Sequence, residues 1–266
     1  MSLSISGKTA IITGGANGIG LAIGRHFADK GANVMFADID EEGLNEQFGE
    51  QQDGDSIRYF AGDLREKLTL ANLLSATIDA FDKVDVLVNA SRQVVTSDSL
   101  NPDDDAVEML LEQNLMTGLR LSQLVAKRMI KQSEDQDEGC VGSIINLSSI
   151  AAGRTHPDLL AYSISSAAVD QMTRSLAVTL APHRIRVNAL AFGSVMSASL
   201  RAALKENRGY RAEIEQHTPL GRIASPNELA EAVQFLASDS AAFMTGQIMT
   251  MDGGRSLVDP VAAPAH

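Results

Sequence analysis

The sequence is poor in cysteine, in positive charge and in long apolar runs. Its 266 residues include one cysteine, Cys140, which excludes an intrachain disulfide and any metal site built from several cysteines. Lys and Arg number 22 against 34 Asp and Glu, and the resulting net charge of −12 argues against nucleic acid or an anionic membrane as a partner. No apolar stretch approaches the roughly 18 residues of a membrane helix, and residues 1–7 show no signal peptide, so we expect a cytoplasmic protein.

Short apolar runs alternate with longer amphipathic segments along the chain. Hydrophobic residues make up 44% of the sequence and charged residues 21%, which suits a globular protein with a sizeable core. The apolar patterns predict strands over 8–13, 33–37, 57–61, 84–89, 141–147, 184–189 and 247–251, and helices over 18–30, 67–81, 103–131, 158–181 and 226–238. This alternation predicts an α/β fold, a doubly wound Rossmann-type parallel sheet of about seven strands flanked by helices on both faces.

No break in composition marks a second domain, so residues 1–266 are expected to form a single nucleotide-binding domain. Two segments interrupt the alternation. Residues 131–139 form a strongly acidic loop, which we interpret as solvated. Residues 194–218 are polar and rich in Arg, Glu and Ala, and they are expected to form a helical insert that covers a substrate.

A glycine-rich turn, TGGANGIG at residues 13–20, joins the first predicted strand to the first predicted helix. Glycines at such a turn permit a tight bend and a close approach of the backbone to a diphosphate. The helix N-terminus adds free N–H groups and the positive end of its dipole. The turn therefore predicts a binding site for the diphosphate of a dinucleotide; the alternative is a glycine-rich turn without a ligand.

Asp38 ends the second predicted strand, 18 residues beyond Gly20. A carboxylate there accepts hydrogen bonds from both hydroxyls of an adenosine ribose and repels a 2′-phosphate. No Lys or Arg occurs in residues 14–20 or 38–43 to hold such a phosphate, so NAD is predicted in preference to NADP. The alternative for Asp38 is an ordinary turn residue. Asp63 and Leu64 follow the third strand, where they either meet the adenine or form a plain turn.

Several motifs together resemble those of the short-chain dehydrogenase/reductase family, along nearly the whole chain. Residues 13–20 have the spacing of that family's cofactor loop, and Ser149 precedes Tyr162 by 13 residues, the family's usual separation. Asn114 lies in the long predicted helix where the family keeps an active-site Asn. Its other landmarks are matched by residues 146–149, 188–197, 220–222, 226–228 and 252–254.

The resemblance implies a role for each matching residue. In this family the Tyr is the general acid/base for hydride transfer to or from C4 of nicotinamide, the Ser orients the substrate oxygen, and the Asn supports a water-linked proton path. By position these catalytic roles fall on Tyr162, Ser149 and Asn114. The residues expected to contact the dinucleotide are Gly14, Asn17, Gly18, Ile19, Gly20, Asp38, Ile39, Asp63, Leu64, Asn89, Ala90, Tyr162, Ser166, Gly193 and Val195.

The sequence departs from the family four residues after Tyr162. The family has a Lys there, which binds the nicotinamide ribose and lowers the Tyr pKa, whereas this chain has the uncharged Ser166. An unperturbed Tyr has a pKa near 10, so only about 0.1% is ionised at pH 7, a handicap on the order of 4 kcal/mol for a base that must be ionised. The reduction of a ketone is less affected by the absence of the Lys, because the neutral Tyr is the form that donates a proton.

Two further departures lie near the nicotinamide end. The family's Asn-Asn-Ala-Gly motif appears as NASR at residues 89–92, so that Arg92 replaces a glycine, and its Pro-Gly appears as Phe192 and Gly193. Arg92 either fills the space beside the cofactor, where it adds the missing positive charge, or points away into solvent.

The sequence as a whole predicts an oxidoreductase that transfers a hydride between NAD(H) and a secondary alcohol or ketone, of hydroxysteroid or 3-oxoacyl type. The alternative is a catalytically impaired nucleotide-binding or regulatory homologue. The expected partners are a small-molecule carbonyl or alcohol substrate and further copies of the chain, as a homotetramer or dimer built through the two long helices and the last strand. His156, His183 and His217 lack ligand-like spacing, so no metal site is predicted.

Overall fold

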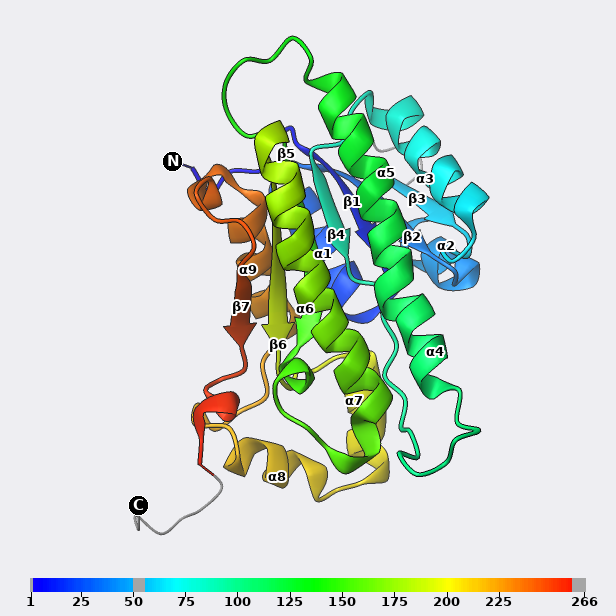
Figure 1. Cartoon of the computed structure of the whole chain (residues 1–266), viewed down its shortest axis with the longest axis vertical. Coiled ribbons are helices and arrows are strands. Elements are labelled where there is room, and N and C mark those ends of the chain that lie inside the picture. The colour runs from blue at the N-terminus through cyan, green and yellow to red at the C-terminus, as the bar shows by residue number, and fades with distance from the viewer. Residues whose placement is uncertain (1, 50–55, 260–266) are drawn as a thin grey trace.

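The chain folds around one parallel β-sheet with helices on both faces (Figure 1). The computed structural model describes residues 2–49 and 56–259; residues 1, 50–55 and 260–266 of the expected single domain lie outside this part. The described residues form a seven-stranded sheet in the order β3-β2-β1-β4-β5-β6-β7, and every pairing is parallel. Its strands are β1 (Thr9–Thr13), β2 (Asn33–Asp38), β3 (Ile57–Ala61), β4 (Val86–Asn89), β5 (Gly142–Ser149), β6 (Ile185–Phe192) and β7 (Ile248–Met251).

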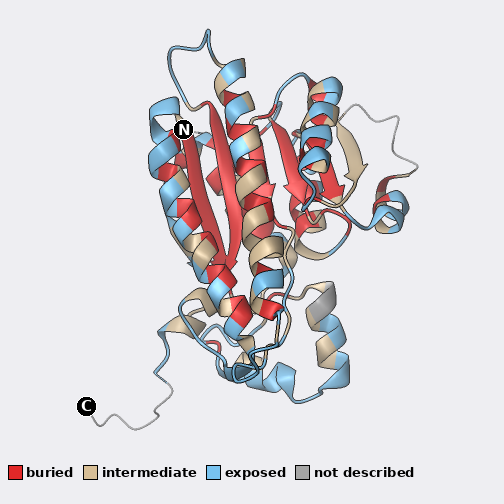
Figure 2. Cartoon of the chain, turned by 45° about the vertical axis from the view of Figure 1, so that its right-hand side comes forward, coloured by how far each residue is buried: buried red, intermediate tan, exposed pale blue. Residues whose placement is uncertain are grey.

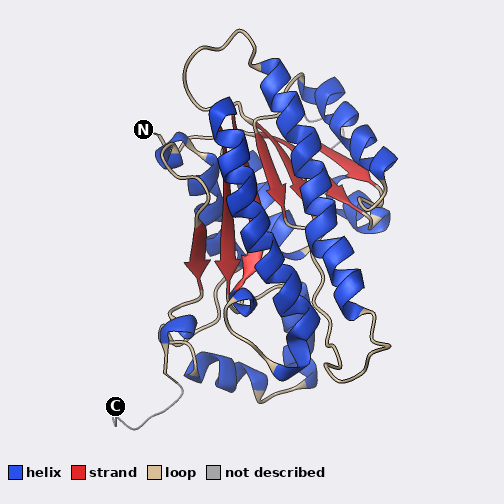
Figure 3. Ribbon diagram, in the orientation of Figure 1, coloured by secondary structure: helices blue, strands red, loops and turns tan. Residues whose placement is uncertain are grey.

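The helices form two layers, one on each face of the sheet (Figure 3). One face is covered by α1 (Gly18–Asp29), α2 (Glu41–Phe48) and α9 (Pro226–Ala237), and the other by α3 (Lys67–Phe81), α5 (Thr117–Gln132) and α6 (Leu160–Leu180). The other helical elements of the described residues are α4 (Ala106–Leu110), the π-helical turn η1 (Leu111–Met116), α7 (Ala198–Glu206), α8 (Tyr210–Gln216), η2 (Ile150–Ala152), η3 (Pro157–Leu159), η4 (Ala181–His183), η5 (Asp239–Ala241) and η6 (Arg255–Leu257). None of the described helices combines the length and apolar character needed to span a bilayer.

The central strands are buried because helices cover both faces of the sheet. All residues of β1, β5 and β6 are buried, and Figure 2 shows these strands between layers of partly exposed helices. The two helix layers create two cores, since successive side chains of a strand point to opposite faces. Ile12, for example, contributes to the core under α1 and α9, while its neighbour Ile11 contributes to the core under α3 and α5.

The order of the strands reverses at β1, which places a crevice in front of the sheet. Strands β2 and β3 lie on one side of β1, while β4 to β7 follow on the other. In such doubly wound sheets, ligands bind at the carboxyl ends of the strands where the order reverses. The α7 and α8 helices lie beyond this edge, below the arrowheads of β6 and β7 in Figure 1.

The predicted fold class is confirmed. Several bounds differ by a few residues, for example at the end of β6, which was predicted at residue 189 and lies at Phe192. Three further local features also differ from the predictions. The α2 helix was not predicted, because Leu44 and Phe48 are its only buried side chains and its start depends on a local cap, in which the Asp40 carboxylate accepts the Gly43 N–H. The helix predicted over 103–131 begins at Ala106, where the Asp104 carboxylate accepts the backbone N–H of Ala106 at 2.8 Å. Its path then widens into the π-helical turn η1, which periodicity alone does not reveal.

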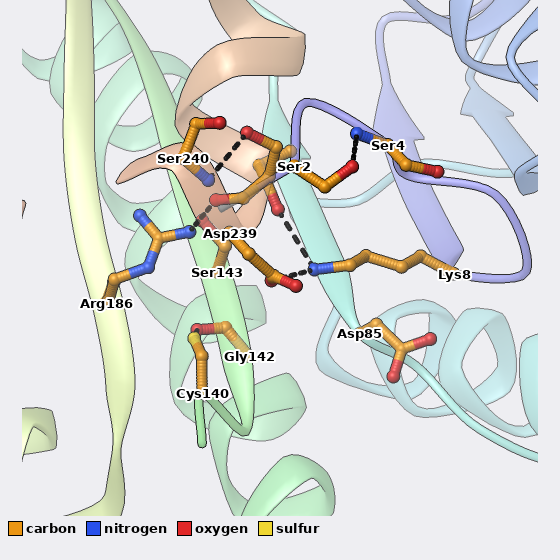
Figure 4. A network of polar contacts seen from close by, with 12 residues as sticks. Ser2, Ser4, Lys8, Asp85, Cys140, Gly142, Ser143, Arg186, Asp239 and Ser240 are labelled. Atoms are coloured by element: carbon orange, nitrogen blue, oxygen red, sulfur yellow. Dashed lines mark hydrogen bonds and ion pairs between the residues drawn. The ribbon is translucent and has the colours of Figure 1, made fainter. Parts of the chain in front are cut away.

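A polar network joins α9 to the amino ends of the strands, at the edge opposite the crevice (Figure 4). The buried Arg186 of β6 donates through Nη2 to the carbonyl oxygens of Leu236 at 2.8 Å and Ser238 at 3.2 Å. Lys8, before β1, pairs with Asp239 at 2.9 Å. Because the carbonyls at the end of α9 carry the negative end of the helix dipole, the Arg186 cation satisfies them and fixes α9 against the sheet.

Replacing Arg186 by Met removes the hydrogen bonds to the end of α9 while keeping an apolar stem of similar length. We expect the free energy of unfolding to fall by about 2–3 kcal/mol, the usual effect of losing buried hydrogen bonds to a charged group, as measured by urea denaturation. The control is Arg25→Met, which alters an exposed α1 arginine that contacts Gln47. Its free energy of unfolding should stay within about 0.5 kcal/mol of that of the unmodified protein. Equal losses in the two variants would contradict this role for Arg186.

Candidate active site

The turn between β1 and α1 requires glycine at two positions because backbones approach each other closely there. Gly14 has φ +68°, and a Cβ on it would lie 3.0 Å from the backbone of Ala90. A Cβ on Gly20 would lie 2.1 Å from the carbonyl oxygen of Gly14. The Thr13 hydroxyl accepts the backbone N–H groups of Ala90 at 2.9 Å and of Ser91 at 3.0 Å, so the end of β4 is attached to the same turn.

The first turn of α1 offers backbone donors to the cleft in front of the sheet. Asn17 occupies the N-cap position in extended conformation, and its side chain makes no capping hydrogen bond among the described residues. Asn17, Gly18, Ile19 and Gly20 all line the cleft. Free N–H groups and the positive end of a helix dipole bind anions such as a diphosphate, so this turn fits the group that the sequence predicted.

The predicted adenosine end contains Asp38 and Asp63, both of which line the same cleft. The Asp38 carboxylate accepts the backbone N–H of Ala16 at 3.0 Å and of Asp40 at 3.1 Å. Asp63 forms an ion pair with Arg65 at 2.6 Å, and the hydrogen bonds from Arg65 lower the pKa of that carboxyl group. Arg65 is a cation at this end that the sequence did not predict, because it lies after β3, outside residues 14–20 and 38–43.

The cleft has a volume of about 1230 Å³ and extends along the carboxyl edge of the sheet from Asp38 to the α7 and α8 region. It brings together most of the predicted cofactor residues: Gly14, Asn17, Gly18, Ile19, Gly20, Asp38, Ile39, Asp63, Leu64, Ala90, Tyr162, Gly193 and Val195. Ser194, Leu200, Tyr210 and Ile214, from the segment predicted to cover a substrate, line its other end. Arg154 also lines it, as do Arg255 and Val258, and no sequence signal pointed to the last two.

Ser149 and Tyr162 reach the cleft from different elements. Ser149 is the last residue of β5, and its hydroxyl accepts the backbone N–H of Ala151 at 3.1 Å. Tyr162 lies in the first turn of α6, and only 5% of it is exposed. Both residues line the cleft, so the spacing of 13 residues brings the predicted hydroxyl pair to one site.

Asn114, Ser166 and Asn89 line a second, smaller cavity of about 20 Å³ rather than the large cleft. Tyr162 and Arg92 line both, so they stand between the two spaces. Asn114 lies in the π-helical turn, where its amide accepts the Gln93 N–H at 2.8 Å and donates to the Gln93 carbonyl at 3.0 Å. A cavity of this size holds about one water molecule.

Arg92 fills the space beside the site and does not point away into solvent. Its guanidinium carbon lies 5.0 Å from the centre of the Tyr162 ring and 4.6 Å from the centre of the Phe192 ring. Its Nη1 donates to the carbonyl oxygen of Ser148 at 2.7 Å. Burial lowers the pKa of the guanidinium to about 10, which leaves it positively charged at neutral pH.

Three comparisons with known proteins agree on the class of protein. A family model described as enoyl-(acyl carrier protein) reductase matches residues 14–256. The chain is 33% identical over 254 residues to the 7alpha-hydroxysteroid dehydrogenase of Escherichia coli (strain K12), which covers 95% of this chain and 96% of that protein. It is also 33% identical over 258 residues to the 3-oxoacyl-[acyl-carrier-protein] reductase of Thermotoga maritima, with 95% and 99% of the two chains covered.

A solved structure has the same fold at similar identity. It is a 7alpha-hydroxysteroid dehydrogenase complexed with NADH and 7-oxo glycochenodeoxycholic acid, with a TM-score of 0.86, 33% identity and 95% of each chain covered. The chain therefore belongs to the short-chain dehydrogenase/reductase family of oxidoreductases, whose members bind nicotinamide cofactors. The family resemblance seen in the motifs is confirmed.

Replacing Gly20 by Ala tests whether the closed turn forms the nucleotide site. The added methyl group cannot fit against the Gly14 carbonyl, so the turn must open and its amide groups must move. We expect the affinity for NADH, measured by calorimetry, to fall by at least about tenfold, or about 1.4 kcal/mol. The control is Gly209→Ala, because a Cβ on Gly209 meets nothing within 4 Å. Unchanged NADH affinity in a folded Gly20→Ala protein would contradict the assignment of this site.

Proposed function

We propose that the protein transfers a hydride between NAD(H) and a secondary alcohol or ketone. The observation that carries the proposal is that Ser149 and Tyr162 line the same cleft as the glycine turn and Asp38. This brings a hydroxyl pair suited to a carbonyl oxygen together with a site suited to a dinucleotide. When bound, the nicotinamide cofactor supplies or accepts the hydride.

NAD is proposed in preference to NADP because of Asp38. Its carboxylate lines the cleft one strand away from the glycine turn and would repel a 2′-phosphate. Arg65 is the nearby cation that could offset this repulsion, but its guanidinium is bound to Asp63 through hydrogen bonds of 2.6–3.0 Å. The NADH in the related hydroxysteroid dehydrogenase structure supports the same choice.

The proposed roles of the side chains follow from the chemistry of a carbonyl oxygen. In reduction, the Tyr162 hydroxyl donates its proton to the oxygen that becomes the alcohol, and the Ser149 hydroxyl donates a hydrogen bond to the same oxygen. Asn114 holds the loop at Gln93 and donates to the Ser165 hydroxyl at 3.3 Å, beside the small cavity. A water molecule there would link Tyr162 to the proton path proposed for Asn114.

The remaining features are proposed from the shape and surface of the chain. Residues 194–218 cover the substrate, which would be an apolar ketone or alcohol because Leu159, Phe192 and Leu200 line that end of the cleft. A homodimer or homotetramer is proposed because α6 exposes Ile164 and Val178, and Phe243 is fully exposed near β7. A cytoplasmic location is inferred from the composition, in particular from the lone cysteine.

Turnover tests the proposed function directly. NADH oxidation is measured with a 7-oxo bile acid, a 3-oxoacyl thioester and a cyclic ketone as substrates. We expect at least one to be reduced, with NADH preferred to NADPH. For that substrate, Tyr162→Phe and Ser149→Ala should each lower kcat/KM by about 100-fold or more, because each removes a donor to the reacting oxygen.

The matched control is Tyr59→Phe, which makes the same chemical change on β3, where the Tyr59 ring stacks on Phe48. Its turnover should equal that of the unmodified protein. Tight NADH binding without turnover on any ketone or alcohol would instead support the catalytically impaired homologue. Turnover that survives Tyr162→Phe would contradict the role of Tyr162.

A further inference from the structure

The proton-transferring residue proposed above lies on a helix that offers it no charge. Ser166, four residues after Tyr162, is on the same buried face of α6 and lines the small cavity with it. A buried phenolate needs a nearby positive charge or hydrogen-bond donors to be stable. The charged groups of α6 lie further along the helix, since Asp170 and Arg174 follow Tyr162 by two turns or more.

A cation does reach Tyr162, but from the loop after β4. The Arg92 guanidinium lies over the Tyr162 ring, with its central carbon 5.0 Å from the ring centre, and it also packs on the Phe192 ring at 4.6 Å. The hydrogen bond to the Ser148 carbonyl fixes its position along the cleft. Among the described residues, no carboxylate lies within 4 Å of Arg92 to neutralise it. Its charge is therefore available to the phenol.

We propose that Arg92 supplies the positive charge that stabilises ionised Tyr162, a task for which α6 provides only a neutral side chain. This inference rests on the proposed role of Tyr162. In reduction, the proton leaves the Tyr162 oxygen for the substrate oxygen, and the phenolate that remains regains a proton from water. Negative charge on a phenolate spreads into the ring, so a cation over the ring face lowers its energy. Arg92 acts through Tyr162 and is thus a positioning residue.

Other titratable groups near the site also influence the ionisation of Tyr162, but they are the same in the unmodified protein and in the Arg92 variants. On α6 the Asp170 carboxyl accepts the Ser148 hydroxyl at 2.5 Å, and burial raises the pKa of Asp170. Arg174 lies one turn beyond it on the same helix. The remaining charged or titratable groups around the substrate end of the cleft are Arg154, His156, Tyr210, Glu213, His217 and Arg255. A substitution at Arg92 leaves all of these in place.

The test is a spectroscopic titration of tyrosinate in the protein without dinucleotide or substrate. The chain has three tyrosines, so the difference between the unmodified protein and Tyr162→Phe isolates one transition. An opposite charge within about 4–6 Å moves a pKa by about one to three units. We therefore expect the Tyr162 transition in Arg92→Gln to occur about one to two pH units higher than in the unmodified protein.

Three further variants separate charge from packing. Arg92→Lys keeps a cation and should restore most of the shift, and Arg92→Gln combined with Ser166→Lys should restore it from the helix side. Phe192→Leu disturbs the packing around Arg92 without removing its charge, and it should leave the transition lower than in Arg92→Gln. Circular dichroism confirms that each variant is folded before titration.

Two results would overturn the proposal. One is a Tyr162 transition that Arg92→Gln does not raise. The other is an Arg92→Gly protein that binds NADH more tightly and turns over faster than the unmodified protein with the transition unchanged, since the guanidinium would then be an obstruction. Because the titration needs no turnover, a shifted transition in an inactive protein would count against the proposed function and not against this role of Arg92.

Discussion

The site depends on a contact between two stretches of backbone that leaves no room for a side chain. At Gly20, a Cβ would lie 2.1 Å from the carbonyl oxygen of Gly14, so the turn after β1 closes directly onto the first turn of α1. The residues of the first turn of α1 line the cleft, and the Ala16 N–H donates to the Asp38 carboxylate on the neighbouring strand. Because the strand order reverses beside this turn, the crevice opens where these donors and the carboxylate lie.

The opposite end of the cleft has a different arrangement of charge from the one that the family resemblance implies. The helix that carries Tyr162 has the neutral Ser166 on its buried face, while Arg92 approaches the ring from the loop after β4. The position of this guanidinium over the Tyr162 ring depends on tertiary contacts. It packs on Phe192 of β6 and donates to the Ser148 carbonyl of β5. In the proposed role, the Arg92 guanidinium stabilises ionised Tyr162 from the loop after β4 and not from α6. The same side chain occupies space beside the reacting centre.

Much of the fold could be predicted from the sequence because helices cover both faces of the sheet, which gives most strands a short run of apolar residues. The helix over 67–81 was predicted with the bounds it has in the structure. The α2 helix was not predicted, because it buries few side chains and its start depends on the capping hydrogen bond to Asp40. The glycine turn and Asp38 could be recognised as candidate site residues because each follows from the local sequence pattern at the end of a strand. The direction of Arg92 could not, since it is set by Tyr162 and Phe192, which are 70 and 100 residues away along the chain.

The proposed chemistry requires a dinucleotide bound at the glycine turn, and a crystal structure of the protein grown with saturating NADH tests this most directly. We expect the diphosphate to lie against the first-turn amides of α1, with the adenosine ribose hydroxyls within hydrogen-bond distance of the Asp38 carboxylate. A cleft that holds no nucleotide under these conditions, or a nucleotide bound away from Asp38, would contradict the account.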